Sequence, residues 1–327
     1  MRTIFALTAL IMTSLAADSF SQSPLRTDFY AQPYAGHSFG KTEYVMDIKT
    51  IDGDGNPYRL KSQLEYPLDV LMVGTNVGLT LTPPSGKAWR VELGAFTSVT
   101  DPGGTMYDHD WVAVDNEPLQ KFSYTESDAE MNSILLTLEV GKTVWLDERR
   151  QIELMAGFRW HRIEQDIIGY EGWQLDGNGD RVDVADKTSE ALFYRVTYSL
   201  PHAGLRGGLR LGRMVHVDGK AAFAIVLVSD YDNHLLRNKD AEARITGHGF
   251  IGGAGLRHDL GSTPGRGLFF GLDADILYLT ASGRQTQTWY GDDGATEWDD
   301  TGTEIGGIPH EINTTQYHVG LVFGWRF

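Results

Sequence analysis

Length, composition and charge exclude several classes of protein. The chain has 327 residues, no cysteine, 41% hydrophobic residues and a formal net charge of −16, from 28 Lys and Arg against 44 Asp and Glu. The lack of cysteine excludes disulfides, thiolate zinc sites and cysteine nucleophiles, and the deficit of positive charge argues against a nucleic-acid partner.

The first 22 residues have the features of a secretory signal peptide. Arg2 supplies a positive charge, and Ile4–Leu15 form an apolar stretch of the length that such peptides use. The stretch is shorter than the roughly 20 residues that a membrane-spanning helix needs. We therefore predict a signal peptide over residues 1–22, with cleavage after Ala16 or shortly beyond, and a mature chain, residues 23–327, that forms a single domain.

Several segments of the mature chain alternate between apolar and polar residues, as strands with one apolar face do. The segments are residues 133–140, 151–161, 192–200, 270–278 and 317–327. In the last one the odd positions, from Tyr317 to Phe327, are all apolar, while the even positions are mostly small or polar. Asp273 and Asp275 fall on an inner face, where a polar barrel lumen accepts carboxylates more readily than a soluble core does.

The expected connections between these strands are of two kinds. Short turns are expected at residues 83–86, 147–150, 215–219 and 259–267, and long acidic segments at 101–131, 169–187 and 284–312. The two kinds alternate along the chain. This predicts an all-β fold, a ten-stranded antiparallel transmembrane β-barrel with short periplasmic turns and long extracellular loops. The three long segments hold 20 acidic and 4 basic residues, so they account for the whole net charge and should attract cationic peptides.

Two clusters of chemically active residues fall at the same end of the predicted barrel. One contains Asp108 and Asp110, and the other contains Asp232 and His234. Residues i and i+2 of a strand share a face, so the pattern favours a carboxylate pair opposite an Asp–His pair. An aspartate that holds one imidazole nitrogen leaves the other free to accept a proton. A solvated acidic surface or a divalent-cation site remains an alternative for such residues.

Two further acidic segments look superficially like calcium loops. They begin at Asp52 and Asp176. Both lack the full ligand spacing and the closing glutamate of a calcium loop, so we interpret them as glycine-rich turns.

Four ordered segments resemble the omptin family of outer-membrane aspartate–histidine endopeptidases. They are residues 62–66 (Ser-Gln-Leu-Glu-Tyr), 108–111 (Asp-His-Asp-Trp), 154–158 (Leu-Met-Ala-Gly-Phe) and 229–234 (Ser-Asp-Tyr-Asp-Asn-His). The likeness runs from about Gly40 to Phe327. It implies a barrel in the bacterial outer membrane whose peptidase site faces the cell exterior.

The resemblance also implies a role for individual residues. His234 would act as general base on a water molecule, Asp232 would orient it, and Asp108 and Asp110 would hold or activate that water from the facing wall. Selection of a basic residue at the scissile bond would come from Glu43 and Asp230.

Further subsites and partners follow from the same resemblance. An acidic position that selects a second basic residue corresponds to Thr125 or Glu126. Arg162 would contact lipopolysaccharide, the activating lipid of the family, or would be an arginine that reaches the membrane rim. No cofactor or metal would be required.

Two other functions remain compatible with the sequence. A non-proteolytic adhesin or structural barrel could use the divergent loops, one of which carries Trp289 and Trp298. A small diffusion pore could use a lumen lined by Asp273 and Asp275, although inward-facing Glu43, Arg159 and Arg195 could equally close the interior with ion pairs.

Overall fold

The computed structural model describes residues 25–51, 55–84, 86–100, 104–115, 117–260, 267–292, 294 and 299–327. The predicted signal peptide, residues 1–22, lies outside them. The described strands are β1 (Arg26–Ile51), β2 (Pro57–Pro67), β3 (Val70–Thr82), β4 (Trp89–Ser98), β5 (Gly104–Val114), β6 (Gln120–Leu146), β7 (Arg150–Leu175), β8 (Arg181–Leu211), β9 (Val215–His234), β10 (Lys239–Asp259), β11 (Gly267–Trp289) and β12 (Glu304–Arg326). One short 3₁₀ helix, η1 (Leu235–Arg237), follows β9. No helix among the described residues is long and apolar enough to cross a membrane.

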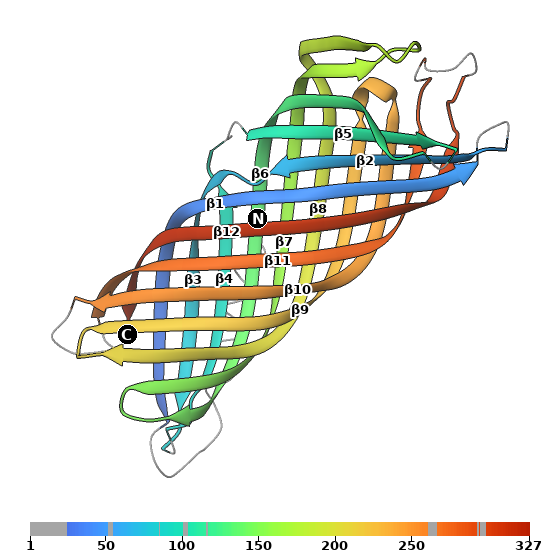
Figure 1. The fold of residues 1–327 in the computed structure, drawn as a ribbon. Coiled ribbons are helices and arrows are strands. Elements are labelled where there is room, and N and C mark those ends of the chain that lie inside the picture. The colour runs from blue at the N-terminus through green and yellow to red at the C-terminus, as the bar shows by residue number, and fades with distance from the viewer. Residues whose placement is uncertain are drawn as a thin grey trace.

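The strands close into one antiparallel barrel of ten strand positions, as predicted. The sheet order runs from β12 through β6 to β4, β3 and β1, and β1 pairs with β12 to close the ring. At one end of the molecule, β2 and β5 take the places of β3 and β4 between β1 and β6. In Figure 1, β1 and β12 to β9 cross in front of β6, β7 and β8.

A glycine marks the point where β1 exchanges one neighbour for another. β1 pairs with β3 up to Ser38 and with β2 from Lys41 onward. Between them Gly40 has a φ of 136°, and a Cβ there would lie 2.1 Å from the carbonyl oxygen of Thr315. Only glycine fits a left-handed backbone this close to another strand. The exchange places β2, and through it β5, at the upper rim of the ring.

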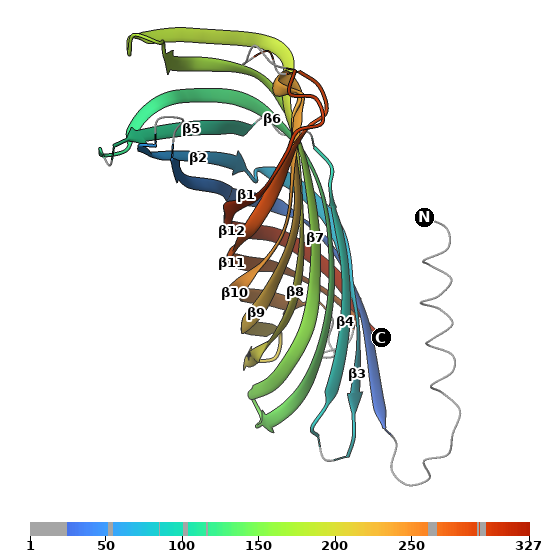
Figure 2. The same cartoon turned by 90° about the vertical axis from the view of Figure 1, so that its right-hand side faces the viewer.

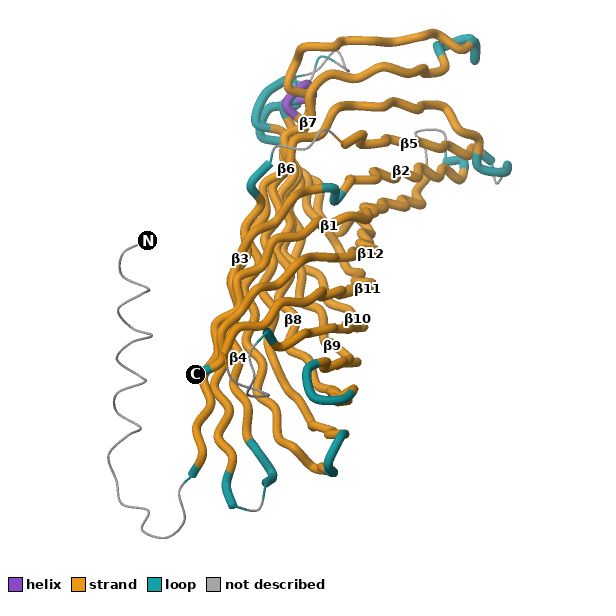
Figure 3. Tube along the Cα trace, turned by 90° about the vertical axis from the view of Figure 1, so that its left-hand side faces the viewer, coloured by secondary structure: helices purple, strands orange, loops and turns teal. Residues whose placement is uncertain are grey.

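The two ends of the barrel differ. Figure 3 shows the connections gathered at the two ends of the strands, and Figure 2 shows β2, β5 and the β7–β8 hairpin projecting at one of them. We call this the loop end. The opposite end, where β3 turns into β4 and β6 into β7, is the turn end.

Two sequence expectations about the connections are corrected by the structure. Residues 215–219 are not a turn but the start of β9, and the turn lies at residues 212–214, where Gly212 has a φ of 74°. The described parts of the acidic segments 101–131, 169–187 and 284–312 are mostly strand rather than loop. These strands extend beyond the part of the barrel that carries outward-facing apolar side chains. Their backbone pairing therefore continues although the alternation of apolar and polar residues stops.

A belt of exposed apolar side chains surrounds the barrel. On β12, Val319, Leu321 and Phe323 are 47–64% exposed, while His318 and Val322, at the alternate positions, are buried. The same alternation occurs on β6 and β9, where Leu136 and Ile225 point outward. An outward apolar band with a polar interior is the pattern of a transmembrane barrel.

A charged residue in the middle of this belt should destabilise the inserted protein. Leu321→Arg is expected to cost about 2–4 kcal/mol, the range for a basic residue near the bilayer midplane. Glu311→Arg lies on the same strand beyond the belt and is the matched control. The check is unfolding by denaturant in lipid vesicles. Equal stability of the two variants would contradict the placement of the belt.

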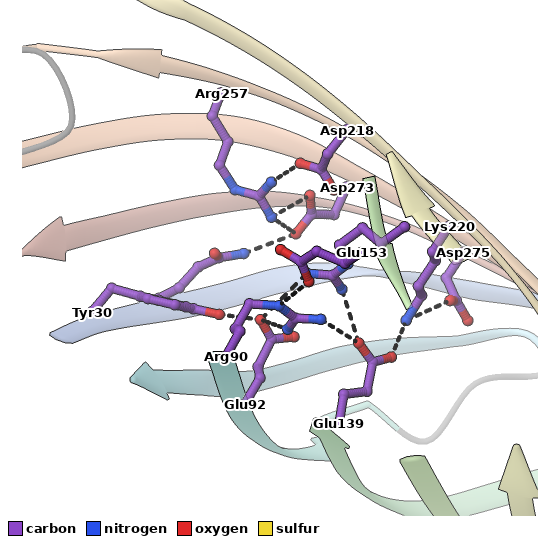
Figure 4. A network of polar contacts seen from close by, with 12 residues as sticks. Tyr30, Arg90, Glu92, Glu139, Glu153, Asp218, Lys220, Arg257, Asp273 and Asp275 are labelled. Atoms are coloured by element: carbon purple, nitrogen blue, oxygen red, sulfur yellow. Dashed lines mark hydrogen bonds and ion pairs between the residues drawn. The ribbon is translucent and has the colours of Figure 1, made fainter. Parts of the chain in front are cut away.

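The lumen at belt height is filled by a network of ion pairs (Figure 4). Glu139 lies 2.7 Å from the Lys220 ammonium and 2.9 Å from Arg206, and Arg159 lies 2.7 Å from Asp275. Asp273 contacts Arg257 at 3.2 Å. A cavity of about 130 Å³ lies among these groups, and a second of about 230 Å³ is lined by Arg90, Glu92 and Arg257 on the side of the turn end. Side chains that cross the lumen in this way favour a closed interior over an open pore.

Candidate active site

Two rows of inward-facing polar residues approach each other at the loop end. β5 contributes Asp108 and Asp110, which pair with Leu64 and Ser62 of β2. β9 contributes Asp230, Asp232 and His234. In both strands the period of two that builds the barrel wall places these side chains on the inner face.

Asp232 and His234 of β9 lie beside each other. Nε2 of His234 lies 3.1 Å from Oδ2 of Asp232, within ion-pair distance. The Asp232 side chain is fully buried, whereas that of His234 is 20% exposed. An aspartate beside one ring nitrogen can orient an imidazole and leave its other nitrogen free.

The carboxylates of β5 and β9 interact electrostatically. Burial and the negative charges of Asp110 and Asp232 raise the pKa of Asp108 to about 8, while the positive charge of Arg237 works in the opposite direction. A carboxyl with this pKa keeps its proton at neutral pH and can donate a hydrogen bond. Oδ1 of Asp108 and both carboxylate oxygens of Asp232 are buried and have no hydrogen-bond partner among the described residues, so these atoms are available to a group placed between the walls.

Aromatic residues form a floor beneath these carboxylates. Tyr66 of β2 and Tyr194 of β8 stack with ring centroids 4.1 Å apart and planes 7° apart, and Tyr44 of β1 meets Tyr194 edge-on at 6.2 Å. All three are buried, and burial raises the pKa of each hydroxyl well above its usual value. Burial is the main cause of the raised pKa of Asp108, and the charge of Asp108 in turn contributes to the raised pKa of Tyr66.

The structure does not bring together the two residues expected to select a basic side chain. Asp230 lies on the inner face beneath Asp232, where Nε2 of His310 is 3.0 Å from its Oδ2. Glu43 lies on the other face of β1 from the buried Thr42 and Tyr44, and its carboxylate is 2.5 Å from the Lys41 ammonium.

The assumption that Glu43 and Arg195 face inward is therefore wrong. Arg195 lies over the ring of Tyr231 at 5.1 Å, and Tyr231 alternates with the inward residues of β9. In both cases the period of two was assigned with the wrong parity, because a one-residue error reverses every side chain.

The remaining predicted contacts are distributed over both faces. Thr125 of β6 is opposite Asp108 in the ladder, whereas its neighbour Glu126 is opposite Tyr107 and accepts a hydrogen bond from Tyr124. Thr125 is thus the candidate that faces the site. Arg162 of β7 lies on the outer wall, half-exposed and paired with Glu164.

Of the two acidic segments interpreted as glycine-rich turns, only the one at Asp176 lies within the described residues. Asp176 accepts hydrogen bonds from the backbone N–H groups of Asn178 and Asp180, at 2.8 and 2.9 Å, as expected of an Asx-type turn. Residues 52–54 of the other turn lie outside the described residues. In the described part of the chain, no cluster of three or more His, Asp and Glu side chains could hold a metal ion.

Sequence reasoning missed His310, Arg237 and the aromatic floor. Each interacts with residues that are far apart from it in the chain. The alternation in β12 does place His310 on the inner face with His318, but its partner Asp230 is 80 residues away. Only the register of the closed barrel brings that pair together.

Comparisons with known proteins identify a family and a solved structure with the same fold. The sequence model of the Omptin family matches residues 53–256. The crystal structure of the outer membrane protease OmpT from Escherichia coli is similar to this chain with a TM-score of 0.74 and 15% identity, over 95% of this chain and 99% of that one. OprG of Pseudomonas aeruginosa is matched at a TM-score of only 0.32 and 12% identity, over 93% of this chain and 97% of that one. No curated protein matches the sequence significantly.

Proposed function

Because the chain belongs to the omptin family, we propose that it is an outer-membrane endopeptidase whose site opens at the loop end, toward the cell exterior. The OmpT structure, which shares the fold, is that of an outer membrane protease. The observation that carries the proposal is the Asp232–His234 contact of 3.1 Å on a wall that is electrostatically coupled to Asp108.

Residues on both walls take part in the proposed hydrolysis of the peptide bond. His234, oriented by Asp232, accepts a proton from a water molecule that attacks the peptide carbonyl carbon. Protonated Asp108, supported by Asp110, donates a hydrogen bond to the water or to the carbonyl oxygen as negative charge develops there. No side chain forms a bond to the substrate, so the step needs no nucleophile other than water.

The proposed substrates are cationic peptides and proteins cleaved next to a basic residue. The acidic loop end attracts positive charge, and Asp230 is the buried carboxylate directly beneath the Asp–His pair. In this proposal Asp230 binds the basic side chain of the substrate without help from Glu43. Arg162 lies on the outer wall, where its guanidinium could bind a lipid phosphate, so we also propose lipopolysaccharide as the activating lipid.

Cleavage of a quenched peptide that contains two adjacent arginines, by protein refolded with lipopolysaccharide, tests this function. Cleavage beside an arginine supports an endopeptidase. A folded barrel that cleaves no such peptide but binds host surfaces, and still does so after substitution of His234, supports the adhesin instead.

The pH dependence of cleavage should report the proton on Asp108. Activity is expected to fall as the pH rises through about 8, because Asp108 then loses the proton that it donates. Arg237 favours the charged form of Asp108, so Arg237→Gln should move this alkaline limb to higher pH. The measurement is kcat/KM against pH. Arg181→Gln, at the start of β8 in the projecting β7–β8 hairpin, should leave the profile unchanged, and an unmoved limb in Arg237→Gln would contradict the role of Asp108.

A further inference from the structure

A second buried Asp–His pair lies directly beneath the first. Oδ2 of Asp230 is 3.0 Å from Nε2 of His310, and the two side chains are only 2% and 0% exposed. Asp230 comes from the same inward row of β9 as Asp232, two residues closer to the belt, while His310 comes from β12. The ring of Tyr44 packs against His310 with centroids 4.3 Å apart, so the histidine is fixed from the side of β1.

The two carboxylate oxygens of Asp230 have different surroundings. His310 occupies Oδ2, whereas Oδ1 is buried and has no hydrogen-bond partner among the described residues. A guanidinium binds a carboxylate most strongly through two parallel N–H···O bonds, one to each oxygen. An ammonium is a point charge that needs only one oxygen. A carboxylate with one oxygen already occupied therefore loses more as a partner for arginine than as a partner for lysine.

The neighbouring carboxylates do not compensate, because Asp232, whose charge acts on Asp230, is itself in contact with His234 at 3.1 Å. Glu43 lies on the outer face of β1 and pairs with Lys41. The inner face near His310 carries the amide side chains Gln285 and Gln287, which lie 3.3 and 3.5 Å from the sulfur of Met46. Nζ of Lys239 is 3.4 Å from Gln287.

We propose that His310 is a specificity-determining residue of the peptidase site, which occupies one oxygen of Asp230 and so removes the preference for arginine over lysine that a free carboxylate would confer. The inference rests on the proposed function. His310 itself touches neither the water nor the scissile bond.

The test compares three peptides that differ only in arginine, lysine or the uncharged norleucine at the scissile position. The wild-type protein should cleave the arginine and lysine peptides with kcat/KM values within about threefold of each other, and both better than norleucine. His310→Ala frees the second oxygen and should raise the arginine-to-lysine ratio about tenfold, the effect of one charge-assisted hydrogen bond, mainly through KM. His310→Gln retains an N–H donor and should keep the wild-type ratio.

Each result of this test either supports or contradicts the inference about His310. An unchanged ratio in His310→Ala that still cleaves the lysine peptide overturns the inference and leaves the endopeptidase intact. Should His310→Ala not fold, the unaltered protein decides, because an arginine preference above tenfold in wild type is incompatible with an occupied Asp230. Absence of cleavage of all three peptides by wild type would contradict the proposed function itself, and this inference with it.

Discussion

Replacement of His234 by alanine is expected to lower kcat by about 10²–10⁴-fold, the contribution of a positioned general base, while the barrel still folds. The side chain is one-fifth exposed at the mouth, so its removal leaves no buried cavity. Asp232→Asn should cause a loss of similar size, because an amide no longer favours the imidazole orientation and charge that proton transfer needs. The measurement is steady-state cleavage of the quenched peptide in lipopolysaccharide.

The sequence supplies a matched control for this experiment. His109 lies between Asp108 and Asp110 in the chain, but it points to the other face of β5, where Nδ1 is 2.8 Å from the Lys121 ammonium. His109→Ala should therefore retain activity within about twofold, as expected of a substitution away from the chemistry. Equal activity of His234→Ala and wild type would contradict the Asp–His mechanism. A loss of activity in His109→Ala as large as in His234→Ala would show that such substitutions reduce activity by disturbing the structure of the site.

The barrel could be predicted from the sequence because its wall follows a local rule. Alternation in residues 317–327 predicted that Tyr317 and Leu321 face lipid while His318 and Arg326 face inward, and the exposed fractions of Tyr317, Leu321 and His318 agree. Beyond the belt both faces of a strand meet water or the site, so the alternation of hydrophobicity disappears while backbone pairing continues. The acidic segment 169–187 therefore looked like a loop, although most of it is strand.

The site could be predicted only as far as it lies within single strands. The contact of Asp232 with His234 follows from spacing along one strand, and so does the shared face of Asp108 and Asp110. The Tyr66–Tyr194 stack and the Asp230–His310 pair depend on how strands far apart in sequence meet across the lumen. No local pattern carries that information. Glu43 was misplaced for a related reason, because a shift of one residue along the strand decides whether its side chain lies on the inner or the outer face of the barrel wall.

The ion-pair network in the lumen should contribute strongly to stability, and Glu139 is its central acid. Its carboxylate contacts Lys220 at 2.7 Å, Arg206 at 2.9 Å and Arg90 at 3.5 Å, and its side chain is 5% exposed. Glu139→Gln leaves three cations with less counter-charge inside a closed barrel. Breaking a buried pair by removing one partner typically costs about 3–5 kcal/mol, and we expect a loss of that size in the free energy of unfolding.

An exposed ion pair on the same barrel separates this effect from the simple loss of a charge. Glu171 and Lys187 lie 2.9 Å apart in the projecting β7–β8 hairpin, with side chains 61% and 76% exposed, and Glu171→Gln should cost less than about 1 kcal/mol. Denaturant unfolding in detergent micelles measures both variants. A comparable small loss in both would mean that water reaches Glu139 and screens its partners. In that case the lumen would be hydrated at this height, and the case for a closed interior would fail with the stability prediction.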